Sequence, residues 1–469
     1  MTSPPLLYQL LEKLSKPELR EIKKLVRSPY VTHRQDIPLL FNTLADFCYQ
    51  GKPLPGKELL FQTVFGNQPY DDQLLRSLMS DLHLIIEKYL TWNTATADEV
   101  SSHLALAGFY RQRNLPKHYS RTIKKADRKQ GQQPYRNADF FQNQLKFQLE
   151  TSKFQSTQQR TGHLNLQEIG DTMDVLYLAQ KLRHVCSQLS HRAVYQTDYQ
   201  FGLLQGWIDQ LEDSSYLDIP AIALYYYCYR FLTEAYSQAY FRKFREHLLI
   251  HYAQFPQAEL KDLYRAAINF CIRKLNEGSL EFTREGWELY QEGLLKGFFI
   301  ENHQLSRFTF DNIVGFGLRL EEFLPVAQFI ESYKSYLPED YKESTVYFNL
   351  ARLEYGQKNY DKALTHLQAA NPKDLVNQLI AKTIQLKIYY EAGEFNLLES
   401  HLDSFRLFIR RREVSDYHRK NFQNIISYTR KLITSNPYDN QETEKVKEMI
   451  LQEEILSERK WLLRKLEKM

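Results

Sequence analysis

The 469-residue chain is poor in the two residues that interrupt helices, with 17 glycines and 16 prolines. All-β proteins need more of both, because glycine and proline supply the backbone conformations of tight turns. Inside a helix, glycine costs about 1 kcal/mol and proline about 3 kcal/mol relative to alanine, so long helices contain few of either. The scarcity therefore favours an all-α fold.

Cysteine is also scarce, and long apolar runs are absent. Cys48, Cys186, Cys228 and Cys271 lie far apart and form no C-x-x-C pair, which argues against a disulfide framework and fits a reducing compartment. The longest uncharged apolar run, residues 219–229, is short of the roughly 20 residues that a membrane-spanning helix takes. The opening sequence MTSPPLLYQLLEKL lacks the basic and apolar regions of a secretory signal. We therefore expect a cytoplasmic protein without membrane association.

The short motifs of common catalytic sites are missing from the sequence. It contains no G-x-x-x-x-G-K-[ST], G-x-S-x-G or H-E-x-x-H, and the pair Gly315 and Gly317 lacks the third glycine of G-x-G-x-x-G. His247 and His251 would share one face of a helix and could bridge a metal, but no third ligand follows from the sequence. We interpret them as two ordinary surface histidines. The expectation is a non-enzymatic protein with no catalytic residue, metal or cofactor.

Helical periodicity is what the sequence has in abundance. Near the N-terminus it predicts helices over residues 6–14, 17–26 and 36–49, and Ser15 with Glu18 fits a capping box for the second of these. A further helix begins at Asp71 or Asp72 and ends at about Tyr89. The polar stretch 91–98 then marks the first domain boundary.

Three segments in the C-terminal half, residues 311–334, 347–370 and 382–405, repeat one pattern at spacings of 36 and 35 residues. Small residues at a helix crossing let two helices approach closely, and a single helix pair cannot bury its apolar face alone, so successive pairs must stack. The aligned first-helix residue, second-helix residue and preceding aromatic residue are Gly315, Ala327 and Phe323; Ala351, Ala363 and Tyr360; and Leu386, Leu398 and Phe395.

This pattern resembles the tetratricopeptide repeat, whose unit has about 34 residues, small residues at the crossing and an aromatic residue at the second helix. Residues 356–363 and 393–395 resemble the turn between the two helices of that unit, and the resemblance is clearest over about residues 305–410. It implies a superhelical array of helix pairs that binds a peptide or protein in a groove lined by the first helices. The partner-binding residues that it implies are Tyr347, Arg352, Tyr355, Lys382 and Tyr389.

The predicted architecture is therefore all-α and has four parts. An N-terminal helical bundle precedes irregular helix pairs, a tetratricopeptide-like array and one long C-terminal helix that caps the array or, alternatively, protrudes as a dimerisation helix. The parts are residues 1–95, 96–300, 301–435 and 436–469. In addition, residues 6–26 resemble the opening of death-fold adaptor domains, which are self-associating six-helix bundles. The oligomeric state and the identity of the partner do not follow from the sequence.

Positive charge is concentrated in two segments of a chain whose net charge is only +4. Residues 111–136 hold nine Lys or Arg and one Asp, and residues 406–431 hold eight Lys or Arg and two acidic residues. Such segments could follow a phosphate backbone, so nucleic-acid binding is the alternative function. We favour an acidic protein or peptide as the partner of these segments. The simplest interpretation is that each segment is the solvated face of an amphipathic helix. Five cations in the first segment form one basic stripe at helical spacing: Lys117, Arg121, Lys124, Lys125 and Arg128.

Overall fold

The computed structural model describes residues 5–158, 164–195, 197–234, 238–276, 279–435 and 440–468. Over these residues the chain is all-α, as predicted, with α-helices packed mainly against their neighbours in sequence. None of the described helices is long and apolar enough to cross a membrane. The chain divides into two compact units, Met1–Pro134 with Ala138–Leu176, and Tyr135–Asn137 with Tyr177–Met469. The domain boundaries predicted from the sequence stay predictions.

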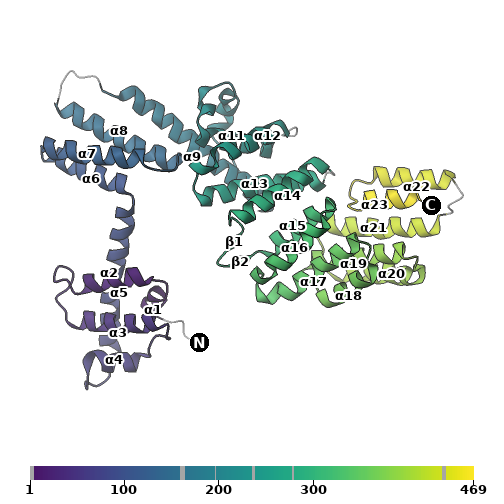
Figure 1. Cartoon of the computed structure of the whole chain (residues 1–469), viewed down its shortest axis with the longest axis horizontal. Coiled ribbons are helices and arrows are strands. Elements are labelled where there is room, and N and C mark those ends of the chain that lie inside the picture. The colour runs from purple at the N-terminus through teal and green to yellow at the C-terminus, as the bar shows by residue number, and fades with distance from the viewer. Residues whose placement is uncertain are drawn as a thin grey trace. The chain divides into compact units, whose positions relative to one another are not determined.

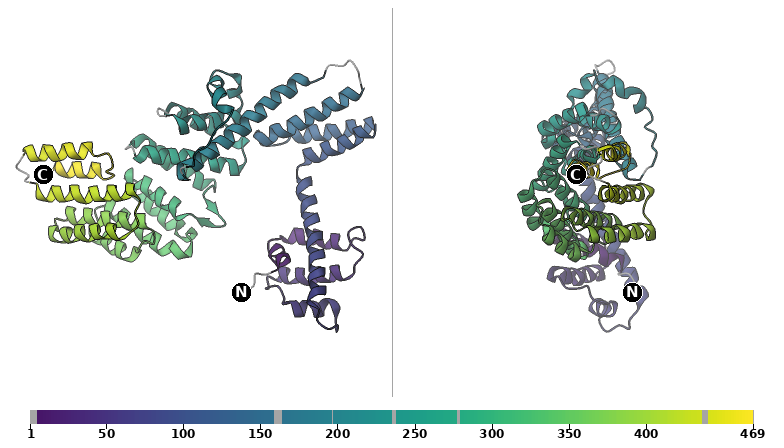
Figure 2. Two further views of the ribbon diagram at one scale, coloured as in Figure 1. Left: turned by 180° about the vertical axis from the view of Figure 1, so that it is seen from behind. Right: turned by 90° about the vertical axis from the view of Figure 1, so that its right-hand side faces the viewer.

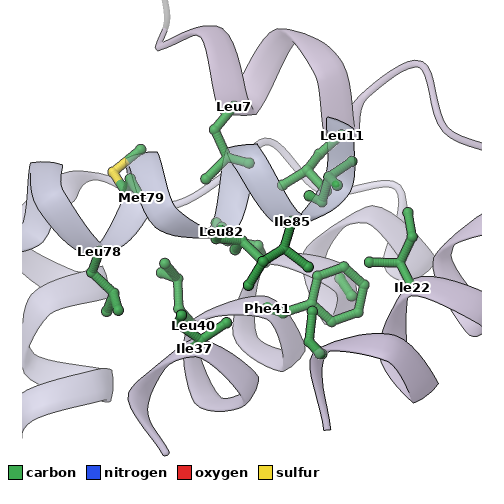
Figure 3. Packing of buried hydrophobic residues seen from close by; sticks show 14 of the residues in the cluster. Leu7, Leu11, Ile22, Ile37, Leu40, Phe41, Leu78, Met79, Leu82 and Ile85 are labelled. Atoms are coloured by element: carbon green, nitrogen blue, oxygen red, sulfur yellow. The ribbon is translucent and has the colours of Figure 1, made fainter. Parts of the chain in front are cut away.

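The first unit begins with a bundle in which four helices pack around the fifth. Figure 3 shows Leu7 of α1, Ile22 of α2 and Phe41 of α3 in one apolar cluster with Leu82 and Ile85 of α5. The bundle has five helices over residues 5–97, whereas the death-fold resemblance implies six. The helices are α1 (Leu6–Leu11), α2 (Lys16–Val26), α3 (Asp36–Gln50), α4 (Lys57–Phe65) and α5 (Asp72–Ala97).

The helices α2 and α5 each begin at the side-chain cap that the sequence predicts. The Ser15 hydroxyl accepts a hydrogen bond from the Glu18 amide (3.4 Å), and the Glu18 carboxylate accepts one from the Ser15 amide (2.7 Å), which confirms the capping box. The Asp71 carboxylate caps α5. However, α5 does not end near Tyr89. The helix continues through the polar stretch to Ala97, with every residue of 91–97 exposed.

Three more helices and the first part of α9 complete the first unit. The helices α6 (Glu99–Gln112) and α7 (Pro116–Gly131) form a pair, and α8 (Ala138–Gln158) packs against both. Tyr119 of α7 stacks on Phe154 of α8, with 3.8 Å between ring centroids. The boundary between the two units falls inside α9 (Leu166–Tyr195).

The second unit is a succession of helix pairs, which Figure 1 shows from α11 to α20. Each pair packs internally and against the next, and this sequential packing is the part of the repeat prediction that the structure confirms. A short segment of α10 (Leu204–Trp207) and the 3-10 helices η1 (Ile208–Leu211) and η2 (Ser215–Asp218) precedes the pairs. The pairs are α11 (Pro220–Thr233) with α12 (Gln238–His251), α13 (Gln257–Asn276) with α14 (Leu280–Leu295), α15 (Arg307–Arg319) with α16 (Phe323–Tyr333), α17 (Glu339–Gly356) with α18 (Tyr360–Ala370), and α19 (Leu375–Glu391) with α20 (Phe395–Arg411); the 3-10 helices η3 (Tyr252–Gln254) and η4 (Lys334–Tyr336) follow α12 and α16.

The last three pairs share one turn between their helices. Glu321, Lys358 and Gly393 occupy the same place in it, with positive φ angles of 60°, 64° and 74°. In each turn the amide of the next residue donates to a carbonyl five residues earlier, at 2.9 Å. This is the left-handed helix ending that satisfies otherwise unpaired carbonyls. The turn gives a structural register for the repeats.

That register corrects the sequence alignment of the first repeat, residues 311–334, by one residue. Counting from the shared turn, Val314 is equivalent to Ala351 and Leu386 in the first helices. In the second helices, Val326 is equivalent to Ala363 and Leu398. Val314 and Val326 are fully buried, like the other four residues. Gly315 and Ala327, which the sequence placed there, are only half-buried.

A β-hairpin that the sequence did not predict separates α14 from α15. The strands β1 (Ile300–Glu301) and β2 (Gln304–Leu305) pair antiparallel, with Ile300 opposite Leu305. Asn302 and His303 form the two-residue loop with φ of 49° and 61°, as a type I′ turn requires.

The chain ends in two helices rather than the one long helix predicted. Figures 1 and 2 show α23 (Arg459–Leu466) lying between α21 (Asp416–Thr434) and α22 (Asn440–Gln452). Side chains of α21 hold the intervening loop away from a helical path. The Ser457 amide donates to Asn421 Oδ1 (2.7 Å), and Asn424 donates to the Ile455 carbonyl (3.0 Å). Trp461 and Leu462 of α23 are buried in the last apolar core.

Candidate partner-binding site

The five predicted partner-binding residues are all half-buried and lie on two different sides of α17 and α19. Three of them face the second helix of their own pair, where each side chain packs against an aromatic or histidine ring of that helix. The three pairs are Tyr347 with His366 (5.8 Å between ring centroids), Lys382 with Phe408 (5.1 Å from Nζ to the ring centroid) and Tyr389 with His401 (5.6 Å between ring centroids).

Arg352 and Tyr355 lie instead between first helices of neighbouring pairs. Arg352 Nη1 donates to the carbonyl of Asp311 in α15 (2.9 Å) and to Asn349 Oδ1 (2.9 Å). The Tyr355 hydroxyl donates to Glu391 Oε1 in α19 (3.3 Å). We call the surface formed by α15, α17 and α19 at these residues the first-helix face. The structure brings Arg352 and Tyr355 together on it and places the other three residues elsewhere.

A carboxylate held by two amides ties the three helices of the first-helix face together. Asp311 Oδ1 accepts from Asn349 Nδ2 (2.6 Å), and Oδ2 accepts from Asn377 Nδ2 in α19 (3.0 Å). Burial raises the pKa of Asp311, and the opposing effects of Arg352, Asn349 and Asn377 do not fully cancel it. This network fixes the spacing of three successive first helices. It also occupies the Asp311 carboxylate with amide donors rather than with a cation.

The Arg352 guanidinium is consequently a half-buried charge without an ion-pair partner. No carboxylate oxygen of the described residues lies within 4.0 Å of its nitrogens. Burial lowers the pKa of Arg352; nearby Asp311 opposes this effect, and the charge of Arg319 adds to it. The Arg352 guanidinium can lie here because Gly315 has no side chain. A Cβ at residue 315 would be only 2.8 Å from Arg352 Nη2. This site can accept an anionic group from outside the chain.

A second carboxylate cluster joins α23 to the end of the first-helix face. Glu391 Oε1 accepts from Trp461 Nε1 (2.7 Å) and pairs with Lys465 Nζ (2.7 Å), while Oε2 accepts from the Tyr360 hydroxyl (2.7 Å). Burial acts to raise the pKa of Glu391, but hydrogen bonds from Lys465, Trp461 and Tyr360 outweigh it and leave the pKa below its ordinary value. The cluster is saturated by its own donors and therefore serves to hold α23.

The basic stripe of the first unit is entirely on the surface of α7. All five side chains are exposed, and no carboxylate oxygen of the described residues lies within 4.0 Å of their charged nitrogens. The opposite face of the helix is buried through Tyr119 and Ala126. The stripe runs over twelve residues, from Lys117 to Arg128, or about 16 Å at the rise of an α-helix. In the other basic segment, which belongs to the second unit, Arg430 is paired with Asp403 (2.6 Å).

The two histidines considered as metal ligands lie against one another on α12. Their ring centroids are 5.8 Å apart, and His251 Nδ1 is hydrogen-bonded to the Gln254 amide (3.2 Å). Burial lowers the pKa of His247. Within the part of the chain that the structure describes, no three His, Cys, Asp or Glu side chains are grouped so that they could hold a metal ion. The pair therefore gains no third ligand from the fold.

Comparisons with protein-family models, curated proteins and solved structures give no match. The likeness to tetratricopeptide repeats therefore rests on the repeat pattern and the sequential helix pairs.

Sequence reasoning missed one feature, a cavity of about 520 Å³ beside the hairpin. The local turn signals there were Gly297, which has a φ of 72°, and Asn302 in the loop of the hairpin. Two residues of strand on either side are too few for an alternating pattern to be recognised.

Proposed function

We propose that this chain is a non-enzymatic, cytoplasmic scaffold. Its helix pairs form a tetratricopeptide-like superhelical array, and the first-helix face holds an acidic segment of a protein partner. Sequential packing and the turn shared by three pairs support the array. The four cysteines, which are all free thiols, fit a reducing compartment.

The observation that carries the proposal is the unpaired guanidinium of Arg352. A charge that is removed from water without a counter-charge is costly, and an incoming carboxylate offsets that cost. Arginine presents a planar fork of donors that matches a carboxylate, and the bonds to Asp311 and Asn349 already fix its orientation. Arg319 adds positive charge nearby. An acidic partner therefore meets a preorganised cation rather than a flexible surface side chain.

The proposal is tested by affinity capture of the full-length protein from cells of its native host, followed by quantitative mass spectrometry. We expect a stoichiometric partner that is lost with Arg352→Gln and partly retained with Arg352→Lys, since lysine keeps the charge but loses the fork. Lys362→Gln is the matched control, because Lys362 is exposed on the second helix α18. Equal recovery of the partner by Arg352→Gln and by the wild type would refute binding at this face.

Nucleic-acid binding through α7 is a second candidate, favoured by the five unpaired cations of the basic stripe. It predicts an affinity that falls steeply with salt, because each neutralised phosphate releases counterions. A gel shift with single- and double-stranded probes is expected to give a complex at about 50 mM salt that Lys117→Gln with Arg121→Gln and Lys125→Gln abolishes. The absence of any complex at that salt concentration would remove this candidate.

A further inference from the structure

The position that Arg352 occupies recurs in three successive helix pairs. Gly315, Arg352 and Lys387 each lie six residues before the turn residue with positive φ, so they form one column across the first-helix face. Gly315 contributes no side chain, whereas Arg352 and Lys387 each bring a cation. The two cations differ in their counter-charges, and this difference decides where an anion from outside the chain can bind.

The cation of the last pair is neutralised by the C-terminal part of the chain. Lys387 Nζ lies 2.9 Å from Glu458 Oε2, and Glu458 is the residue just before α23. Lys387 also lies over the ring of Tyr355, 5.1 Å from its centroid. A single carboxylate from outside the helix pairs thus matches a single lysine. The column therefore already holds one anion, next to the position of Arg352.

The donors that Arg352 has left form one edge of its guanidinium. Nη1 carries two hydrogens, and it donates to the Asp311 carbonyl and to Asn349 Oδ1, which uses both. Nε and Nη2 make no hydrogen bond to the described residues, and both remain open to solvent. These two nitrogens form the side edge of the guanidinium, which can bind two oxygens of one anion at the same time.

A second guanidinium lies one helical turn from Gly315 on α15. Arg319 follows Gly315 by four residues, so the two share one face of the helix, and Arg352 Nη2 lies over Gly315. The Arg319 side chain is exposed, and its Nη1 donates to the carbonyl of Leu275 in the last turn of α13 (3.1 Å). No carboxylate oxygen in the described part of the chain lies within 4.0 Å of the Arg319 nitrogens.

The two guanidinia repel one another, and main-chain carbonyls hold both in place. The charge of Arg319 contributes to the lowered pKa of Arg352. The carboxylates that oppose the lowered pKa values are otherwise engaged, since Asp311 is held by two amides. Glu458, which acts on Arg319, is paired with Lys387. An anion that contacts both guanidinia would therefore remove a repulsion that the chain itself leaves in place.

Two guanidinia at one site favour a phosphoryl group over a carboxylate. A carboxylate has one negative charge and two oxygens, so the edge of a single arginine uses both oxygens. A phosphorylated side chain carries a charge of about −1.5 to −2 at pH 7 and three acceptor oxygens, which suffices for two arginines. Its charge matches Arg319 and Arg352 together, as one carboxylate matches Lys387.

We propose that Arg352 and Arg319 bind the phosphoryl group of a phosphorylated side chain in the acidic segment of the protein partner. The side edge of Arg352 holds two of its oxygens, and Arg319 holds the third. This inference rests on the proposed function, because it names the anionic group that the first-helix face recognises. Binding of the partner then depends on its phosphorylation.

The test measures binding of the full-length protein to three pools of short, fluorescently labelled peptides by anisotropy. The pools are degenerate in sequence and differ only in the central residue, which is phosphoserine, glutamate or serine. We expect the phosphoserine pool to bind at least about tenfold more tightly than the glutamate pool, and the serine pool to bind most weakly. Inorganic phosphate is expected to compete with the phosphoserine pool, whereas sodium chloride at the same ionic strength competes less.

The two arginines are expected to respond differently to substitution. Arg352→Gln should weaken binding of both the phosphoserine and the glutamate pools, whereas Arg319→Gln should weaken the phosphoserine pool alone, by at least about tenfold. Arg406→Gln is the matched control, because Arg406 is exposed on the second helix α20. A thermal melt of each variant checks folding. Arg319 is exposed, so its substitution decides the proposal even where Arg352→Gln lowers stability.

Treatment of the cell extract with a protein phosphatase separates this inference from the proposed function. We expect the partner to be lost after dephosphorylation. Capture through Arg352 from treated and untreated extract alike would overturn the phosphoryl group and leave an acidic segment as the ligand. Equal capture by Arg352→Gln and the wild type would remove the proposed function itself.

The peptide pools supply the remaining outcomes. The proposal is overturned if the phosphoserine and glutamate pools bind alike, or if Arg319→Gln binds the phosphoserine pool as the wild type does. Binding of inorganic phosphate without binding of the phosphoserine pool would assign the site to a free anion, and would also overturn it.

Discussion

The guanidinium of Arg352 lies over Gly315, with Nη2 2.8 Å from the place where a Cβ of residue 315 would be. In the structural register of the repeats these two residues occupy equivalent positions, six residues before the shared turn residues Glu321 and Lys358. The glycine of one pair thus makes room for the arginine of the next. The sequence pattern assigns Gly315 to packing between the two helices of one pair. In the structure, Gly315 instead contacts Arg352 of the next pair.

Gly315→Ala is therefore expected to weaken partner capture as strongly as Arg352→Gln does, because the new methyl group displaces the guanidinium. Stability should change little, since alanine gains up to about 1 kcal/mol in helix propensity and the displaced atom is the end of a flexible side chain. Capture of the partner and a thermal melt measure the two effects. Gly170→Ala in α9, where a Cβ meets no atom within 4 Å, is the control and should leave capture unchanged. Full capture by Gly315→Ala would show that the position of Arg352 is unimportant.

Two residues further along α15, Gly317→Ala is expected to have the opposite effect, with a large loss of stability instead of a direct loss of partner capture. A Cβ there would lie 2.3 Å from Val326 Cγ2 and 2.8 Å from the Trp287 ring, both in the packed interior. Overpacking of this kind typically costs about 1–3 kcal/mol. Urea denaturation should give a lower midpoint than Gly170→Ala does. A Gly317→Ala midpoint at or above that of the wild type would mean that α15 and α16 are less tightly packed than the structure shows.

The register of the repeats makes a prediction at Lys358, which has a φ of 64° where the next turn has Gly393. A side chain in this conformation costs about 1–2 kcal/mol, and glycine loses about 0.5–1 kcal/mol through its freer unfolded chain. Lys358→Gly is thus expected to stabilise the turn by about 0.5–1 kcal/mol. Slower hydrogen exchange of the α17 and α18 amides would record this gain. Lys362→Gly, inside α18, should instead speed that exchange, and equal effects of the two changes would contradict the register.

Helix pairs and their order could be read from the sequence because the signal is local. Apolar spacing, the capping residues Ser15 and Asp71, and the aromatic residue that opens α16, α18 and α20 are all properties of short segments. The one-residue error at Gly315 arose because small residues were aligned with one another. The equivalent residue, Val314, is apolar and not small, and only the turn conformation identifies it.

Features decided by distant residues could not be read in the same way. Asn421 and Asn424 break the predicted C-terminal helix by bonding to the loop at Ser457 and Ile455, more than thirty residues away. Helical spacing placed Tyr347 on a first helix but did not tell which neighbouring helix it faces. The unpaired state of Arg352 depends on Asn349 and Asn377 occupying the Asp311 carboxylate, and no local pattern records that arrangement.

Acid is expected to loosen the attachment of α23 through Glu391. The pKa of this carboxyl is lower in the folded chain than its ordinary value of 4.5, so the ionised form is stabilised by folding. Its contribution is fully present above about pH 4.5 and is lost as the pH falls through the folded-state pKa. At neutral pH, Glu391→Gln should cost about 1.5–3 kcal/mol, the usual worth of hydrogen bonds to a charged group.

The difference in stability between the wild type and Glu391→Gln should therefore be constant from neutral pH to about pH 5 and shrink below about pH 4.5. Hydrogen exchange of the α23 amides at several pH values measures this difference in the helix that Glu391 holds. Glu399→Gln is the control, because Glu399 is exposed on α20. A difference that stayed constant down to about pH 3 would mean that Glu391 holds Trp461 and Lys465 without being ionised, and would remove the charge from the account of how α23 is bound.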